Sequence, residues 1–151
     1  MKPELEYVLE LRVSIGPVVE LGSGAAGMRR TVAITGGTFS GPAMSGRVLA
    51  GGADWQLVES DGLTLVDAHY AIETDDGVRI EVRNTGVRNG APDLMERIAA
   101  GHAVAPDEYY FRTTPRFEPP EGKYAWLRRA VFVGDGARYA DLVVVKVWRV
   151  M

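Results

Sequence analysis

The sequence predicts a mainly all-β protein, a closed or nearly closed antiparallel β-barrel of calycin-like type with one short helix. Two observations lead to this prediction. Apolar and polar residues alternate over many short segments, which is typical of half-buried strands. Residues that favour tight turns separate these segments. The 151 residues are enough to bury a core without staples, and we expect one domain over residues 1–151.

The alternation is clearest near the N-terminus. Leu9, Leu11 and Val13 share one face of an extended chain, whereas Glu10 and Arg12 lie on the other. Similar runs predict further strands at residues 30–35, 46–50, 54–59, 63–74, 78–84, 108–114, 124–133 and 142–150. Three adjacent hairpins are expected, because Asp61-Gly62, Asp76-Gly77 and Gly134-Asp135-Gly136 suit tight turns.

One segment predicts a helix. Pro92 suits an early helical position and Gly101 suits a stop, so the helix should cover about Asp93 to Ala100 and cap an end of the sheet. The strands could form a sandwich or a barrel, since both arrangements protect sheet edges. We favour the barrel, because several strands are long and the pairs Gly36-Gly37 and Gly51-Gly52 are typical of corners and bulges.

Composition excludes several classes of function. The chain has no cysteine, which rules out disulfides, thiolate catalysis and cysteine-ligated metals. A formal net charge of -3 argues against nucleic acid as a partner. The charged N-terminus has no apolar leader segment, and no stretch is long and apolar enough to span a bilayer. We therefore expect a cytoplasmic protein whose partner is a small molecule, neither nucleic acid nor membrane.

Asp54 and Trp55 form the first candidate site segment. They follow two glycines, and their side chains should point to opposite faces of a strand. If Trp55 fills the core or shell, Asp54 could face the lumen, where a carboxylate can orient a ligand or move a proton. The alternative is an aspartate that caps the bend after Gly51-Gly52.

Tyr110 and Arg112 form the second candidate segment. They share one face of a predicted strand with Thr114. An arginine between a tyrosine and a threonine suits a carboxylate, enolate or phenolate, because guanidinium presents a rigid fork of donors. The alternative is a structural ion pair between Arg112 and Asp54 or a glutamate.

Other polar groups carry weaker signals. The two histidines, His69 and His102, have no spaced carboxylate partners, so we expect no metal site. The glycine-rich segment 22–27 is followed by a strand pattern rather than a helix, which predicts a rim loop instead of a phosphate-binding loop. We expect no cofactor.

The chain also resembles the bacterial and fungal family labelled domain of unknown function 3237, or uncharacterised protein family 0311. The likeness covers nearly the full length. It is carried by residues 34–41, Gly51-Gly52-Ala53-Asp54-Trp55, Thr74-Asp75-Asp76-Gly77, Tyr110-Phe111-Arg112-Thr113 with Pro115 and Phe117, and Tyr124-Ala125-Trp126-Leu127. Family members often have asparagine where this chain has Arg128.

The resemblance implies a compact antiparallel β-barrel. It also implies cofactor-free addition or elimination on conjugated substrates, because some relatives occur beside enzymes of aromatic or polyketide metabolism. Carried onto this chain, the site comprises Asp54, Trp55, Tyr110 and Arg112, with Thr35, Thr38 and Asn84 as further lining.

Two ligand-based functions remain open at this point, beside a third alternative, an interaction protein whose pocket is incidental. One is a lyase or isomerase in which Arg112 and Tyr110 stabilise an oxyanion while Asp54 moves a proton. The other is a barrel that binds a small aromatic or acidic ligand without turnover. Both predict that Asp54, Tyr110 and Arg112 converge on one concave site. The apolar final strand, residues 142–148, further predicts a homo-oligomer, most simply a dimer.

Overall fold

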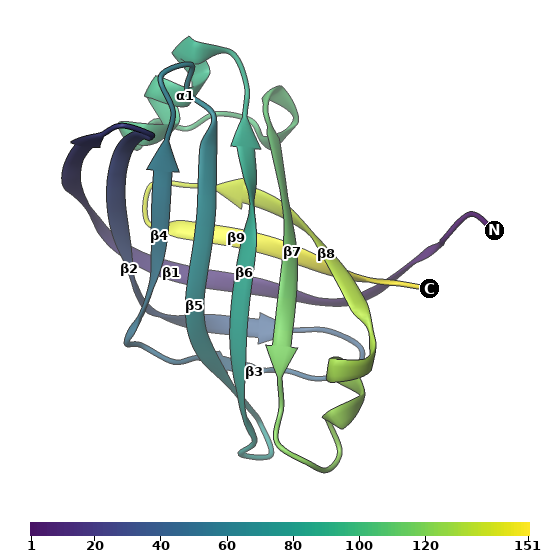
Figure 1. Cartoon of the computed structure of the whole chain (residues 1–151). Coiled ribbons are helices and arrows are strands. Elements are labelled where there is room, and N and C mark those ends of the chain that lie inside the picture. Colours follow the sequence, from purple (N-terminus) through teal and green to yellow (C-terminus); the bar gives the residue numbers. More distant parts are fainter.

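A computed structural model describes all 151 residues. Nine strands form one antiparallel sheet that curls into a barrel (Figure 1). They are β1 (Leu5–Gly24), β2 (Gly27–Ser40), β3 (Gly46–Val48), β4 (Gly52–Val58), β5 (Thr64–Thr74), β6 (Arg79–Asn89), β7 (Tyr110–Glu118), β8 (Val131–Arg138) and β9 (Leu142–Val150).

The sheet closes on itself through a ring of strand pairs. From β1 the ring runs through β9, β8, β7 and β6 to β5. Strand β5 pairs with both β3 and β4, each of these pairs with β2, and β2 pairs with β1. The ring is narrowest between β7 and β8, which share only the pairs Arg112–Asp135 and Thr113–Gly134. Closure limits the pairing of strand edges with another chain. The predicted antiparallel β-barrel is therefore confirmed.

The glycine pairs lie where the strands bend. The pairing of β1 with β2 slips by one residue between Ser14 and Ile15, opposite Gly36. Gly37 has a φ of +131°, and a Cβ there would lie 2.1 Å from the Arg12 carbonyl oxygen. Only glycine fits such a backbone. Gly51, with a φ of +115°, marks the corner between β3 and β4, so both predicted corners are confirmed.

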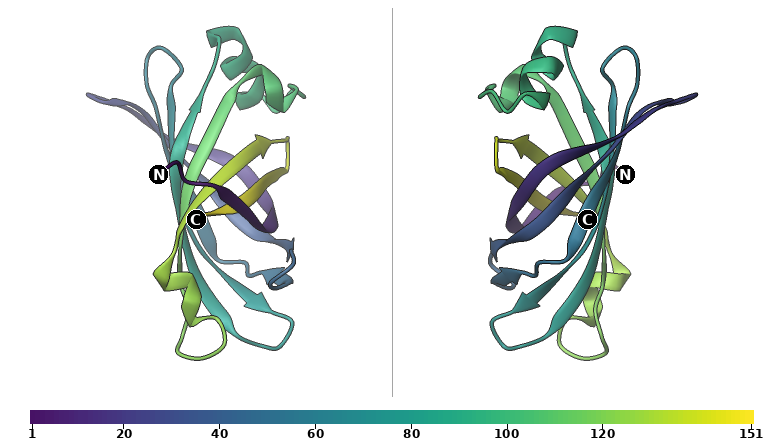
Figure 2. Two further views of the ribbon diagram at one scale, coloured as in Figure 1. Left: turned by 90° about the vertical axis from the view of Figure 1, so that its right-hand side faces the viewer. Right: turned by 90° about the vertical axis from the view of Figure 1, so that its left-hand side faces the viewer.

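One end of the barrel is covered by the helix α1 (Pro92–Ala99) and the 3-10 helix η1 (Pro106–Glu108). Figure 2 shows α1 at one end of the barrel, opposite the end where the 3-10 helix η2 (Ala125–Arg129) lies. Met95 and Ile98 of α1 are buried. The expected capping helix is confirmed. None of the helices is long and apolar enough to cross a membrane.

Two predictions near the C-terminus are wrong. The segment expected as a strand at residues 124–133 begins with η2, and β8 starts only at Val131. Gly134-Asp135-Gly136 lies inside β8 rather than in a turn, and β8 and β9 are joined at residues 139–141 instead. These glycines serve packing, because a Cβ at Gly136 would lie 2.7 Å from the Phe111 ring.

The expected rim loop at residues 22–27 is also a different structure. It forms the tip of the long β1–β2 hairpin, with Gly24 paired to Gly27. The glycines and alanines of this segment have low β propensity. They are extended nevertheless, because the pairing of the flanking residues in β1 and β2 determines the hairpin.

Two apolar clusters fill the interior. The larger contains 20 buried residues, including Leu9, Leu11, Phe117 and Phe132. The smaller contains six and gathers Met95 and Ile98 against strand residues such as Phe111. Within β9, Val145 and Val147 are buried, and Trp148 packs edge-on against Tyr7 with ring centroids 5.3 Å apart. The apolar final strand is thus largely covered within the chain, and the dimer stays a prediction.

Candidate functional site

A cavity of ≈ 40 Å³ lies inside the barrel. Its walls include residues of both apolar clusters, such as Val13 and Phe111, so the cavity lies between them. Six polar residues interrupt this apolar lining: Asp54, Gln56, Tyr70, Asn84, Thr113 and Arg138. They come from β4, β5, β6, β7 and β8, whose alternate residues point inward.

Asp54 enters this cavity because of the bend that precedes β4. Gly52 packs so closely on β5 that a Cβ would lie 2.4 Å from the His69 carbonyl oxygen. After this close approach Asp54 faces the lumen, and Trp55 faces outward with 56% of its surface exposed.

The Asp54 carboxylate also replaces part of the β4–β5 ladder. Asp54 pairs with Ala68 and Leu57 pairs with Leu65, but no pair joins the strands between these two positions. The Asp67 backbone N–H donates instead to Asp54 Oδ1 at 2.8 Å. Gln56 Nε2 donates to Asp54 Oδ2 at 2.7 Å. One carboxylate therefore holds together a local opening in the barrel wall.

Burial raises the pKa of Asp54 above its usual value of 3.8. The hydrogen bonds from Gln56 and the Asp67 amide, and the positive charge of Arg88, act in the opposite direction without cancelling this effect. A carboxyl group with a raised pKa in a cavity can take up and release a proton. The same carboxylate also raises the pKa of Tyr70, although burial is the larger cause.

Two polar atoms of the cavity-lining residues have no partner. Asn84 Oδ1 and Thr113 Oγ1 are buried and make no hydrogen bond within the protein. Buried polar groups are nearly always paired, so these two atoms are open to a hydrogen-bonding group placed in the cavity. A hydroxyl group on the ligand would suit both.

Three buried arginines surround the cavity and its α1 end. Arg30, Arg88 and Arg138 are 8%, 3% and 7% exposed. Arg30 Nε donates to Gln56 Oε1 at 2.7 Å, which extends the chain of hydrogen bonds that ends at Asp54. Arg138 donates to the carbonyl oxygens of Tyr139 and Ala140. Among the residues that line the inner cavity, Arg138 is the one cation and Asp54 the one carboxylate, and Arg30 and Arg88 lie beyond Gln56 and Phe111.

The expected convergence of Asp54, Tyr110 and Arg112 is wrong. Strand β7 turns Phe111 and Thr113 inward, so Tyr110 and Arg112 lie on the outer surface. Arg112 Nη1 binds Asp135 Oδ1 at 2.8 Å, and both side chains are 52% exposed. Arg112 therefore forms a surface ion pair, although its partner is Asp135 rather than Asp54. Tyr110 and Arg112 line a wide groove outside the barrel.

The other predicted lining residues divide in the same way. Thr35, Thr38 and Trp55 are exposed on the outer face, so they do not line the cavity. Asn84 is 6% exposed and does line it. Asp54 and Asn84 are thus the two predicted residues that the fold brings together.

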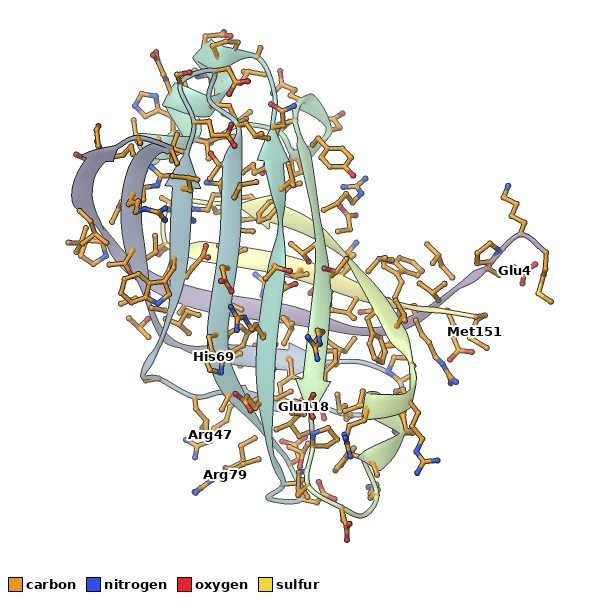
Figure 3. The ribbon with its side chains drawn as sticks, viewed as in Figure 1. Glu4, Arg47, His69, Arg79, Glu118 and Met151 are labelled. Carbon is orange, nitrogen blue, oxygen red and sulfur yellow. The ribbon has the colours of Figure 1, made fainter.

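The outer face carries exposed ion pairs whose residues do not line the cavity. Figure 3 shows Arg47 and Arg79 near one end of the barrel and His69 higher on β5. Arg47 and Arg79 both bind Glu73, and His69 pairs with Glu81. The positive charges lower the pKa of Glu73 through hydrogen bonds from Arg79 and Arg47. Such exposed pairs contribute little to stability.

The sequence contained a signal for the buried arginines. Arg30 is in phase with Val32 and Ile34, Arg88 is in phase with Val82, and Arg138 is in phase with Phe132. A charged residue on the apolar face of an alternating strand predicts either a partner inside the barrel or a ligand.

The sequence of the chain matches a known protein family. The model of a family described as "Protein of unknown function (DUF3237)" matches residues 3–150. The chain belongs to this family. A UPF0311 protein of Rhodopseudomonas palustris is 42% identical over 153 residues, with all of both chains covered.

Other relatives share the fold, and one of them has a name that states an activity. A crystal structure from Rhodopseudomonas palustris has a TM-score of 0.96 at 41% identity and covers 100% of this chain and 99% of its own. A "beta-barrel like protein" from Acinetobacter baumannii has a TM-score of 0.88 at 40% identity, covering 100% and 98%. A relative from Penicillium herquei, 34% identical over 98% of this chain and 84% of its own length, is named a hydroalkoxylation enzyme.

Proposed function

We propose that the protein is a cofactor-independent lyase or isomerase that adds a hydroxyl group across a carbon–carbon double bond, or eliminates it. Its substrate is a small conjugated acid of aromatic or polyketide-like type. The observation that carries this proposal is the placement of Asp54, with its raised pKa, in one cavity with two unpartnered polar residues. The name of the Penicillium herquei relative supports the reaction class.

The polar residues of the cavity would have different roles in such an addition. Asn84 Oδ1 accepts a hydrogen bond from the substrate hydroxyl, and Thr113 Oγ1 orients it. The protonated Asp54 carboxyl donates its proton to one alkene carbon while the hydroxyl oxygen bonds to the other. The hydroxyl proton then returns to the Asp54 carboxylate, so the enzyme is unchanged. Arg138 lines the same cavity and stabilises negative charge on a conjugated carbonyl oxygen.

One observation favours the alternative of a non-catalytic binding protein for a small aromatic or acidic ligand. Asp54 already accepts two hydrogen bonds, from Gln56 and from the Asp67 amide, as a structural carboxylate would. A turnover experiment separates the two functions, because both predict binding and only the first predicts reaction.

The test uses 4-carboxy-2′-hydroxychalcone, a conjugated acid in which a phenol adds to the double bond to give a flavanone. We expect the protein to accelerate loss of chalcone absorbance above the rate in buffer. Thr113→Val removes the inward hydroxyl and should lower the rate by about 2- to 10-fold, the value of one hydrogen bond. Thr114→Val removes the neighbouring outward hydroxyl and should leave it unchanged.

Saturable binding of the chalcone without acceleration would support the binding protein instead. Equal rates with wild-type protein, both threonine variants and buffer, together with no binding, would contradict both functions.

A further inference from the structure

A second hollow lies between the inner cavity and α1. It has a volume of ≈ 220 Å³, and Arg30, Arg88 and Met95 are among the residues that line it. It shares Arg30 with a lateral hollow of ≈ 260 Å³, and the lateral hollow shares Gln56 and Val66 with the inner cavity. The hydrogen bond between Arg30 and Gln56 therefore lies where the three hollows meet.

Arg88 in this hollow is a buried cation without a partner. It is 3% exposed and takes part in none of the eight ion pairs of the protein. Its one specific contact is the face of the Phe111 ring, 5.2 Å from the guanidinium carbon. Glu59, Asp61 and Glu96 line the same hollow but pair with neither arginine. No carboxylate lies within ion-pair distance of Arg88, so its guanidinium donors are free to bind a ligand.

We propose that the hollow beneath α1 is the outer half of the binding site, where Arg88 and Arg30 hold the carboxylate of an aromatic acid. The conjugated carbons of that acid then reach past Gln56 toward the inner cavity, whose ≈ 40 Å³ must widen by movement of its apolar lining to admit them. Guanidinium groups suit this task, since each presents a planar fork of donors to a carboxylate. The proposal rests on the proposed function only for the position of the reacting carbons.

The electrostatics of the site agree with this geometry. Burial, together with the charges of Arg30 and Arg138, lowers the pKa of Arg88 to about 10, while Asp54 and Tyr109 act in the opposite direction. Arg88 still carries its charge at neutral pH. A bound carboxylate would relieve both the burial of the cation and its repulsion by the other two arginines.

Calorimetric titration with 4-hydroxycinnamate and with its methyl ester tests the proposal. The wild type should bind the acid more tightly than the ester. Arg88→Met keeps the apolar stem and removes the charge, so it should weaken binding of the acid by about 10- to 100-fold, as loss of a hydrogen bond to a charged group does. Binding of the ester should change little. Arg112→Met, which removes an arginine from the outer face, is the matched control and should bind both ligands like the wild type.

Equal binding of acid and ester by the wild type, binding of neither, or an unchanged affinity of Arg88→Met for the acid would each overturn the proposal. A readout without a variant is the Arg88 Nε–H resonance in nitrogen-15-labelled protein, which should shift with the acid and not with the ester. These measurements record binding alone. Arg88-dependent binding together with absent chalcone turnover would therefore reject the proposed reaction and retain the anion site.

Discussion

Asp54→Asn should lower the rate of chalcone cyclisation by about 10²- to 10⁴-fold, the usual contribution of a positioned general acid or base. Asparagine has nearly the same shape and can still accept the hydrogen bond from the Asp67 amide, but it cannot transfer a proton. The control is Asp135→Asn, which removes an exposed carboxylate on β8 that pairs with Arg112. Its rate should match that of the wild type.

The same pair of proteins gives a pH-dependent difference in stability. The folded-state pKa of Asp54 is raised, so the folded protein binds this proton more tightly than the unfolded chain does. Protonation of Asp54 contributes to stability at pH values below the pKa that this group has in the unfolded chain. This contribution is lost as the pH rises from the unfolded-state pKa through the folded-state pKa. Urea unfolding should therefore show the wild type losing stability relative to Asp54→Asn as pH rises. The charged neighbours of Asp54 are Arg30, Arg88, Arg138 and Asp67. A difference in the free energy of unfolding between the two proteins that stays constant from pH 3 to pH 8 would contradict the burial of this carboxylate.

Phe132→Ala should lower the free energy of unfolding by about 3–5 kcal/mol, as truncation of a buried aromatic ring does. Phe132 is 2% exposed and packs edge-on against Phe117 with centroids 5.2 Å apart. Its neighbour Val131 points outward and is 66% exposed, so Val131→Ala should change stability by less than about 0.5 kcal/mol. Equal losses in urea unfolding would show that β8 does not present alternate residues to the core.

The sequence was sufficient to predict the barrel and its capping helix, because alternation and glycine turns are local signals. The segment around Trp126 was assigned wrongly to a strand. Its aromatic and apolar residues have high β propensity, yet they form η2, where Trp126 packs against Phe132 from the next strand. Tertiary contacts of this kind override local propensity.

The candidate site was predicted only in part, for a different physical reason. Alternation shows which residues share a face of a strand but not which face lies inside. In β7 both faces carry polar and aromatic residues, so Tyr110 with Arg112 was as plausible inside as Phe111 with Thr113. Glycines on the neighbouring strands determine which face of β7 points inward. A Cβ at Gly86 of β6 would collide with Thr113, and a Cβ at Gly136 of β8 would collide with the Phe111 ring, so these glycines leave the space that Thr113 and Phe111 occupy.

A crystal structure of the protein with bound 4-hydroxycinnamate is the sharpest test of an anion-binding site inside the barrel. We expect electron density for the ligand inside the barrel, with its carboxylate on Arg88 and its hydroxyl within hydrogen-bond distance of Asn84 or Thr113. Density confined to the outer groove beside Tyr110 and Arg112, with the interior unchanged, would contradict it.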